Sequence, residues 1–142
     1  MQNEMELKFL SLSGNEGFAR AVAAAFASQM NPSIEELSDI RTAVSEAVTN
    51  AIIHGYEQRT DRTVLMRITI DGDVLTVTVR DDGCGIGDVE LARRPFYTSK
   101  PELERSGMGF AVMEAFMDAV AVDSEIGRGT TVTMQKRIRH AD

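Results

Sequence analysis

Apolar residues recur with helical spacing in the segment that follows Pro32. Steps of three and four residues put these side chains on one face of a helix, which would pack on the core. Ser33 and Glu36 form a capping box at its start, and Gly55 is a typical residue at a helix end. The pattern therefore predicts a helix from about Ile34 to Gly55. Its expected core positions are Ile34, Leu37, Ile40, Val44, Val48 and Ile52.

A second S-x-x-E pattern, from Ser13 to Glu16, predicts an earlier helix that runs to about Met30. Its expected core side consists of Phe18, Val22, Ala25 and Phe26. Arg20 would project from the opposite side, whose other residues are mostly the alanines Ala23, Ala24 and Ala27. A partner could cover such a bare surface with little loss of side-chain entropy, which makes it a candidate docking patch. A charge that only keeps an alanine-rich helix soluble is the alternative.

Five strands are predicted from short segments that are apolar or that alternate between apolar and polar residues. They span residues 5–10, 64–70, 74–81, 119–122 and 130–136. Asp71-Gly72 suits a tight turn between the second and third strands, because glycine accepts a positive φ. A further turn is expected at Gly127-Arg128-Gly129.

Two polar residues of the predicted second helix lie off its apolar stripe. Glu46 and Asn50 are four positions apart, so they share one face. His54 continues this polar row. Between the row and the stripe lie small residues that would let a ligand approach the helix closely, namely Ala43, Ala47 and Ala51. A solvated helix face with a polar pair is the alternative for this stretch alone.

A carboxylate is predicted at the inward end of the third strand, since a period of two carries Asp81 onto the face of Val77 and Val79. A buried charge is costly unless it meets a donor. The donor could be a backbone amide or an arginine, but the adenine amino group would also serve. The sequence D-D-G-C-G-I-G that begins at Asp81 favours a ligand, because its glycines allow backbone to pass close to a flat molecule. These glycines are Gly83, Gly85 and Gly87.

Residues 88–106 contain two prolines and little core pattern, as expected of a lid over a site. Between Arg93 and Arg105 there are four basic and two acidic residues, a local excess of positive charge. Gly107 and Gly109 follow at the start of an apolar helix, whose free N–H groups and dipole would attract phosphate. Lys100 and Arg105 are near enough in sequence to reach the same phosphates.

Composition narrows the class of protein. A length of 142 residues predicts one domain over residues 1–142, and a net charge of −7 argues against general nucleic-acid binding. No apolar run approaches the roughly 18 residues of a membrane span, and the amino terminus does not read as a signal peptide. The single cysteine, Cys84, agrees with a reducing compartment. These features lead us to expect a cytoplasmic protein that does not bind membranes.

Four short patterns occur in a fixed order along the chain. They are Glu46-x-x-x-Asn50, Asp81-x-Gly83-x-Gly85, Gly107-x-Gly109 and Gly129-Thr130. Each is weak alone, but the ordered set resembles the N, G1, G2 and G3 boxes of the GHKL superfamily of gyrase, heat-shock chaperone, histidine kinase and MutL-type ATP-binding domains. Within that superfamily the chain resembles, from its first strand to its last, the small serine-protein kinases that act as anti-sigma factors. The resemblance is clearest in two segments, S-E-A-V-T-N-A-I-I-H-G-Y (45–56) and P-E-L-E-R-S-G-M-G-F (101–110).

The resemblance implies a fold and a set of roles. The fold would be a two-layer α/β sandwich of the α+β class, with a mixed, mostly antiparallel sheet, helices on one face and ATP under the lid. Glu46 would be the general base, Asn50 would bind Mg²⁺ that bridges the phosphates, and Asp81 would read the adenine amino group. Arg105, together with Lys100, would sense the γ-phosphate. The remaining nucleotide contacts would come from Gly83, Gly85, Gly87, Gly107, Met108, Gly109 and Thr130.

The resemblance also implies a switch between partners. In similar proteins an ATP-bound homodimer holds a sigma factor, here expected to be a sporulation factor of the sigma F type. An anti-anti-sigma protein competes for the same surface and is phosphorylated on serine, and ADP can leave the kinase trapped on this competitor. The open alternatives are a stress-response kinase of the sigma B type and a nucleotide-dependent sigma-binding module without kinase activity. A histidine kinase fits less well, because we expect no phospho-accepting helical hairpin in this sequence. A mechanical ATPase fits less well, because it would need a transducer domain that we do not expect here.

Overall fold

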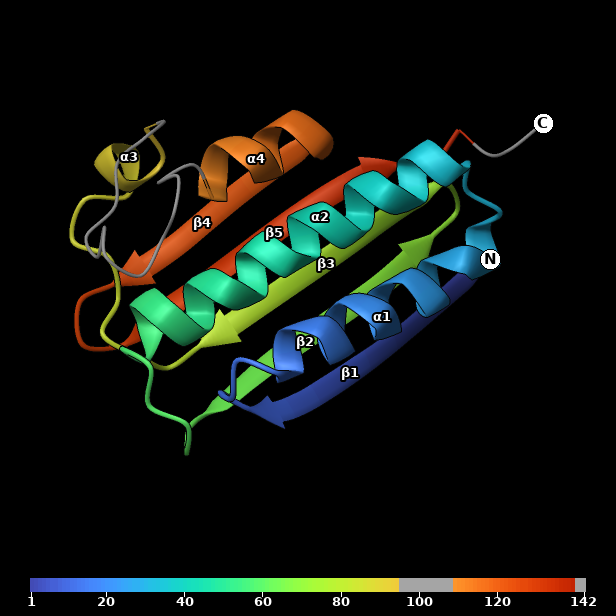
Figure 1. Cartoon of the computed structure of the whole chain (residues 1–142). Coiled ribbons are helices and arrows are strands. Elements are labelled where there is room, and N and C mark those ends of the chain that lie inside the picture. The colour runs from blue at the N-terminus through green and yellow to red at the C-terminus, as the bar shows by residue number, and fades with distance from the viewer. Residues whose placement is uncertain (95–108, 140–142) are drawn as a thin grey trace.

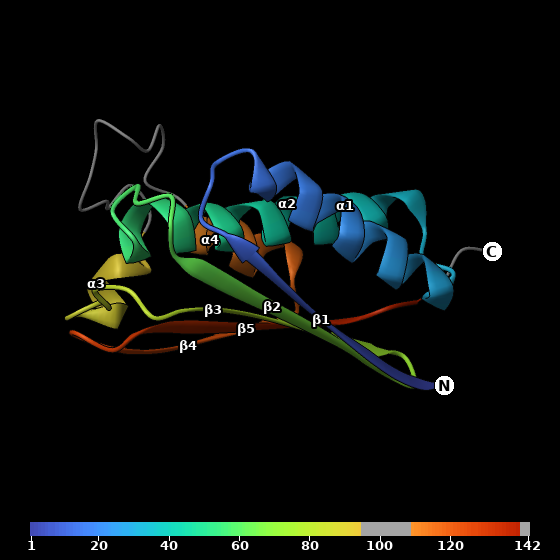
Figure 2. The same cartoon turned by 90° about the horizontal axis from the view of Figure 1, so that it is seen from below.

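A computed structural model of the chain describes residues 1–94 and 109–139, and these form two layers. The helices α1, α2 and α4 cover one face of a sheet, as Figures 1 and 2 show from two directions. Along the chain the elements are β1 (Gln2–Leu10), α1 (Asn15–Ala27), the 3₁₀ turn η1 (Ser28–Met30), α2 (Ile34–Asn50), the π-helical turn η2 (Ala51–Gly55), β2 (Thr63–Asp71), β3 (Val74–Asp81), α3 (Val89–Ala92), α4 (Gly109–Phe116), β4 (Ala119–Glu125) and β5 (Gly129–Arg137).

The sheet has five strands in the order β1-β2-β3-β5-β4. All four of its pairings in the described residues are antiparallel. The sheet is therefore purely antiparallel in this part of the chain, and not mixed as expected. The hairpin turn between β2 and β3 contains Gly72 at φ 59°, as predicted for this dipeptide. The pairing of β3 with β5 sets Asp81 opposite Thr130 at one end of the sheet. Two residues from separate predicted motifs are thereby brought together.

The core lies between the helices and the inward face of the sheet, and α2 runs along its middle. In β2 and β3 burial alternates along each strand, as the sequence predicted. Leu37, Ile40, Val44, Val48 and Ile52 of the predicted stripe are at least partly buried. Ile34 is 90% exposed, so its expected core position is wrong. It is the first residue of α2, next to the N-cap Ser33, where the helix has not yet reached the sheet.

The first helix differs from its prediction in both its start and its buried face. Its N-cap is Gly14 and no side chain caps it, so the predicted capping box at Ser13 is wrong. The Glu16 carboxylate instead accepts a hydrogen bond from the Ser45 hydroxyl of α2. The buried residues of α1 are Ala19, Ala23 and Ala27, while Phe18 is 54% exposed. Small side chains let α1 and α2 approach closely, which explains why the alanines are inside and the expected alanine docking surface is wrong.

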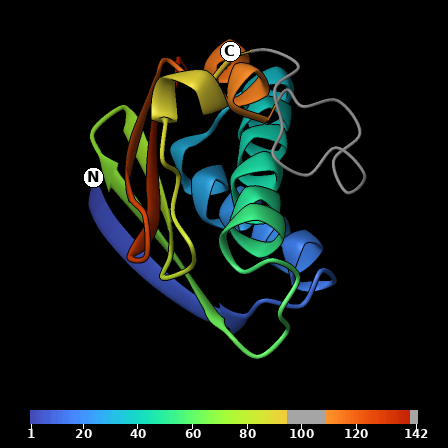
Figure 3. The ribbon, with the colours of Figure 1, turned by 90° about the vertical axis from the view of Figure 1, so that its left-hand side faces the viewer.

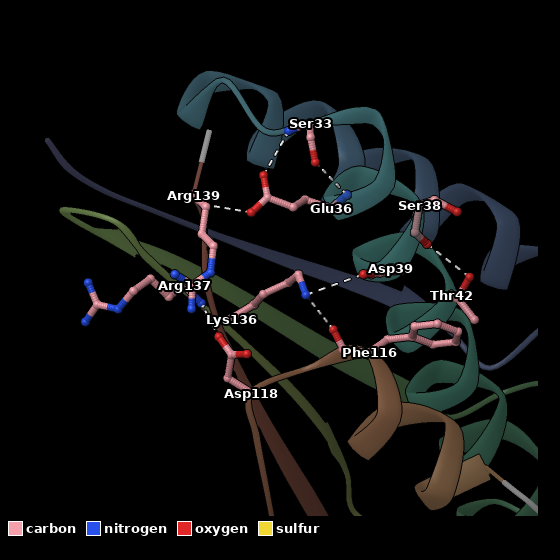
Figure 4. A network of polar contacts seen from close by, with 10 residues as sticks. All are labelled: Ser33, Glu36, Ser38, Asp39, Thr42, Phe116, Asp118, Lys136, Arg137 and Arg139. Atoms are coloured by element: carbon pink, nitrogen blue, oxygen red, sulfur yellow. Dashed lines mark hydrogen bonds and ion pairs between the residues drawn. The ribbon is translucent and has the colours of Figure 1, made fainter. Parts of the chain in front are cut away.

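Polar contacts join the end of the sheet to the helices above it (Figure 4). The Lys136 ammonium of β5 donates a 2.7 Å hydrogen bond to the carbonyl of Phe116 at the end of α4, and it lies 3.5 Å from Asp39 of α2. The predicted capping box of Ser33 and Glu36 is confirmed, and Glu36 also accepts a bond from the Arg139 N–H. One side chain of β5 therefore connects both helices that flank the site. Within the described part of the chain, no helix is long and apolar enough to cross a membrane.

Candidate functional site

A pocket of about 330 Å³ opens between the end of α2 and the sheet. Figure 3 views the molecule from this end, where η2, the loop after β3 and α3 come together. The walls are mostly apolar or glycine, with a few polar groups among them. The lining residues are Ala47, Asn50, Ala51, His54, Gly55, Glu57, Val79, Asp81, Cys84, Gly85, Ile86, Gly87, Asp88, Ala92, Gly109, Phe110, Thr130 and Val132.

Asp81 is the buried acid of this pocket, as predicted. Its side chain is 5% exposed and accepts a 3.0 Å hydrogen bond from the Gly83 N–H. Burial raises the pKa of the Asp81 carboxyl to about 6, although the N–H groups of Gly83 and Thr130 lower it; the nearby Asp82 charge raises it further. The carboxylate still has acceptor capacity toward the pocket, because a carboxylate offers about four lone-pair sites. A ligand N–H donor would therefore be held here.

Glycines bring the backbone of three segments together around Asp81. A Cβ on Gly55 would lie 2.5 Å from Asp81 Cγ, and one on Gly83 would lie 1.9 Å from the Gly55 carbonyl oxygen. A Cβ on Gly85, whose φ is 78°, would lie 2.1 Å from the Glu125 carbonyl oxygen. The close approach that the sequence predicted is thus made to protein backbone at Gly83 and Gly85. Gly85 and Gly87 line the pocket, whereas Gly83 supports it from behind.

The predicted polar pair of α2 divides between two hollows. Asn50 lines the pocket together with Ala47 and Ala51, so these two alanines do form part of a ligand-accessible wall. Glu46, one turn earlier, lines a polar depression between α1 and α2 of about 290 Å³. We call this hollow the Glu46 depression; its other lining residues are Arg20, Ser38, Arg41, Thr42 and Ser45. The predicted base and the predicted docking arginine are therefore neighbours.

A π-helical turn ends α2 and sets the position of the pocket floor. In η2 the Tyr56 N–H bonds the Ala51 carbonyl at 3.0 Å, one residue further back than in an α-helix. π-helical turns are frequent at functional sites. This turn places Gly55 on Asp81 and exposes the Gly55 carbonyl to the Cys84 N–H at 2.9 Å. The sequence predicted the helix end at Gly55 but not the change of helix type.

Two residues that hold the site were missed by the sequence reasoning. The buried Tyr56 hydroxyl accepts from the Asp82 N–H at 2.7 Å and donates to the Thr63 carbonyl at 2.6 Å, which fixes the start of the loop after β3. Ser124 accepts from the Ile86 N–H at 2.7 Å and contacts the Thr130 hydroxyl at 2.7 Å. The signal for Ser124 was present, since Val120, Val122 and Ser124 alternate on one face of β4. A polar side chain at an inward strand position needs a hydrogen-bond partner, and this need identifies Ser124 as it identified Asp81.

Several predicted site residues fall on the part of the chain that the structure does not describe. Lys100, Arg105, Gly107 and Met108 lie there, as does most of the predicted lid at 88–106. Gly109 begins α4 and lines the pocket, as does the adjacent Phe110. Arg93, at the described start of the lid segment, bonds the Glu114 carboxylate and, at 2.9 Å, the Val120 carbonyl. It attaches this segment to α4 and β4.

The residues present fit a nucleotide with a divalent cation. The aliphatic walls and the buried Asp81 suit a flat base with an amino group, and the start of α4 offers backbone N–H groups. No cluster of three or more His, Cys, Asp or Glu side chains that could hold a metal occurs in residues 1–94 and 109–139. A cation at this site would depend on the Asn50 amide oxygen and on phosphate oxygens and water, which is common for Mg²⁺.

Comparison with known proteins places these features in a family. The model of the histidine kinase-like ATPase domain matches residues 14–136. A protein of Clostridium perfringens strain SM101 named anti-sigma F factor is 57% identical over 138 residues, which cover 97% of this chain and 99% of that protein. The anti-sigma F factor of Bacillus subtilis strain 168 is 53% identical, and the match covers 97% of this chain and 94% of that protein.

Two solved structures share the fold at low sequence identity. The RsbU and RsbW domains of a Mycobacterium tuberculosis protein superpose with a TM-score of 0.68 at 18% identity, over 96% of this chain and 32% of that one. Full-length ShkA in complex with AMPPNP gives a TM-score of 0.56 at 20% identity, over 91% of this chain and 31% of that one. The chain thus corresponds to about a third of each of these longer proteins.

Proposed function

Because this chain belongs to the anti-sigma F factors, within the histidine kinase-like ATPase domain family, we propose that it holds a sporulation sigma factor of the sigma F type in an ATP-dependent manner. We further propose that it phosphorylates an anti-anti-sigma protein on serine. The observation that carries the proposal is the pocket in which the buried Asp81 faces aliphatic walls and the start of α4. This is a site for an adenine nucleotide.

The nucleotide would be bound by groups from both layers. Asp81 would accept from the adenine amino group, and Thr130 would hold the same edge of the ring. Gly85, Gly87 and Gly109 would contact the nucleotide along the pocket, with Gly83 keeping the loop in place. The undescribed Lys100, Arg105, Gly107 and Met108 would complete the phosphate site. Bound Mg²⁺, held by Asn50, would neutralise phosphate charge, which is much of what phosphoryl transfer requires.

Glu46 would accept the proton from the hydroxyl of the incoming serine. It lies one helical turn from Asn50, about 6 Å along the axis, and this short separation from the proposed Mg²⁺ ligand supports the role. The Glu46 depression opens to the surface between α1 and α2, so an external serine could reach the carboxylate there. Arg20 lines the same hollow and would contact the partner that supplies the serine. General bases of this kind typically contribute about 10² to 10⁴-fold in rate.

The partners would be exchanged according to the nucleotide. With ATP a homodimer of this chain would hold the sigma factor, and with ADP it would stay bound to the unphosphorylated anti-anti-sigma protein. Such a switch requires that ATP and ADP stabilise different states of the protein, since a ligand shifts only an equilibrium between states that it binds unequally. A sigma factor acts on RNA polymerase, so we place the protein in the cytoplasm. Neither membrane nor nucleic-acid binding is part of this proposal.

One experiment tests binding, chemistry and switching together. The purified chain is mixed with γ-labelled ATP, Mg²⁺, a sigma F-type factor and a candidate anti-anti-sigma protein, and serine labelling and sigma release are followed in the same sample. We expect label on a serine of the anti-anti-sigma protein, with release of the sigma factor. Glu46→Gln should lower the labelling rate by at least about 10²-fold while retaining ATP and sigma binding.

The controls separate the parts of the proposal. Thr42→Ala removes a neighbouring side chain of the Glu46 depression, whose hydroxyl donates to the Ser38 carbonyl of the same helix at 3.0 Å, and it should label at a near-normal rate. Full labelling by Glu46→Gln would remove Glu46 as the base. ATP-dependent sigma binding without any labelling would leave a binding module without kinase activity. No heat from ATP in magnesium buffer with folded protein would reject the whole proposal.

A further inference from the structure

Ser124 sits behind the pocket at the end of β4, where it connects three backbone segments. Its hydroxyl oxygen lies 2.7 Å from the Ile86 N–H, 3.0 Å from the Gly129 carbonyl oxygen and 2.7 Å from the Thr130 hydroxyl oxygen. Ile86 and Thr130 line the pocket, whereas Ser124 is absent from its described lining. Any influence of Ser124 on a ligand must therefore pass through these neighbours.

Counting protons limits the hydrogen bonds that the Ser124 hydroxyl can make at the same time. A hydroxyl carries one proton, a backbone N–H can only donate, and a carbonyl oxygen can only accept. The Ile86 N–H thus donates to Ser124. The single Ser124 proton has two acceptors within reach, the Gly129 carbonyl and the Thr130 hydroxyl, and we infer that it bonds the carbonyl, because both contacts form at once only in that arrangement. The contact with Thr130 can then form only if the Thr130 hydroxyl donates to Ser124. Thr130 is left with lone pairs alone for any further partner.

The same end of the pocket carries a second group that only accepts. Asp81 is paired with Thr130 across β3 and β5, and the Thr130 N–H already bonds the Asp81 carboxylate. Above its pKa the carboxylate has no proton to donate. Asp81 and Thr130 both line the pocket, so the carboxylate and the Thr130 hydroxyl oxygen are two acceptors at the same end of it. The amino group at C6 of adenine has two donor hydrogens, whereas guanine and hypoxanthine carry a carbonyl oxygen there.

We propose that Ser124 is a specificity-determining positioning residue, which selects 6-amino purines over 6-oxo purines by fixing the Thr130 hydroxyl as an acceptor. The inference rests on the proposed adenine-nucleotide function. A 6-oxo purine would set its carbonyl oxygen against two acceptors with no hydrogen between them, which leaves that oxygen unpaired and the lone pairs in contact, and a buried acceptor without a donor is costly. Without Ser124 the Thr130 hydroxyl could turn its proton into the pocket and bond that oxygen.

Binding of ATP and of inosine triphosphate (ITP) to the full chain tests this. Dissociation constants are measured calorimetrically in magnesium buffer at about pH 8, above the pKa of about 6 at Asp81. For the wild type we expect ITP to bind at least about tenfold more weakly than ATP. Ser124→Ala should reduce this ratio at least about threefold, mainly through tighter ITP binding, with ATP affinity within about twofold.

Matched variants separate specificity from structural support. Ser124→Thr keeps the hydroxyl and should restore the wild-type ratio. Ser28→Ala removes a hydroxyl that bonds the Ala24 carbonyl at the end of α1, and it should leave both affinities unchanged. In a Thr130→Val background, Ser124→Ala should no longer change the ratio, because the hydroxyl that it controls is gone.

Three results would overturn the inference. They are a wild-type ratio near one, an unchanged ratio in Ser124→Ala, and equal weakening of both nucleotides in Ser124→Ala, which would show that Ser124 only supports the loop at Ile86. In each of these cases ATP still binds the wild type and the proposed function stands. A folded wild type that binds neither nucleotide would reject both.

Discussion

The α-carbon of Gly55 rests directly on the carboxyl group of Asp81, with no space for a side chain between them. A Cβ at Gly55 would lie 2.5 Å from Asp81 Cγ and within 2.7 Å of both carboxylate oxygens. Gly55→Ala must therefore displace either η2 or the acid. We expect a loss of about 1 to 3 kcal/mol in the free energy of unfolding, as for other overpacked sites, and at least a tenfold loss in ATP affinity. Urea unfolding and titration calorimetry measure the two effects.

Gly14→Ala is the matched control for this change. Gly14 also flanks a helix, but nothing lies within 4 Å of a Cβ built there, and its φ of −63° suits alanine. Its unfolding free energy and ATP affinity should stay near those of the wild type. If Gly55→Ala behaved as Gly14→Ala does, the contact between η2 and Asp81 would not govern the site.

Stability of the nucleotide-free protein should depend on pH through Asp81. Burial raises the pKa of Asp81 from 3.8 to about 6, so the folded protein holds this proton more tightly than the unfolded chain. The free energy of unfolding contributed by this group is therefore greatest below about pH 4 and is lost as the pH rises through about 6. The difference of about 2 in pKa corresponds to about 3 kcal/mol.

Asp81→Asn should remove this pH dependence, since an amide does not titrate in the range. The measurement is urea unfolding of both proteins between about pH 4 and pH 8, with the slope of the wild type compared with that of the variant. Asp123→Asn is the control, because Asp123 is exposed on β4 and is not one of the groups that shift the pKa of Asp81. A wild type whose slope matched that of Asp81→Asn would show that Asp81 is not the titrating group.

The sequence predicted the strands and the inward position of Asp81 well, because both depend on local pattern. Alternation identified the strands to within a few residues, and it correctly turned Asp81 inward. The fold class came from the resemblance, and the family match confirms it. Of the four motifs, Asn50, Asp81, Gly85, Gly109 and Thr130 all line the pocket.

The buried face of α1 could not be predicted, because it depends on which element packs against it. Phe18 reads as a core residue from hydrophobicity alone, yet the close contact with α2 admits only Ala19, Ala23 and Ala27. The roles of Gly83 and Gly85 were also hidden, since the backbones that they contact come from Gly55 and Glu125, far away in sequence. Local pattern shows that a glycine is needed but not what approaches it.

Lys136 should stabilise the fold by joining α4 to α2. Its side chain is 12% exposed, and its ammonium bonds the Phe116 carbonyl at 2.7 Å beside the Asp39 carboxylate. Lys136→Met keeps the length but leaves both acceptors without this donor, so we expect a loss of about 1 to 3 kcal/mol and faster amide exchange in α4. Arg128→Met, at the exposed pair with Glu125, should cost no more than about 0.5 kcal/mol. Equal losses in the two variants would contradict a structural role for Lys136.

Arg20 should matter for partner capture and not for the nucleotide. Its guanidinium is held over the Glu46 depression by an ion pair with Glu16 at 3.7 Å, and its side chain is still 43% exposed. Arg20→Glu puts a negative charge at the mouth of this hollow and should weaken capture of the anti-anti-sigma protein at least about tenfold, as measured by surface-immobilised binding with ADP. ATP affinity should change by less than about twofold, since Arg20 does not line the nucleotide pocket. Arg137→Glu is the control, because it makes the same charge change at the far end of β5, away from the hollow, and should capture the partner normally. The assignment would be rejected by a loss of ATP binding in Arg20→Glu, or by an equal loss of partner capture in both variants.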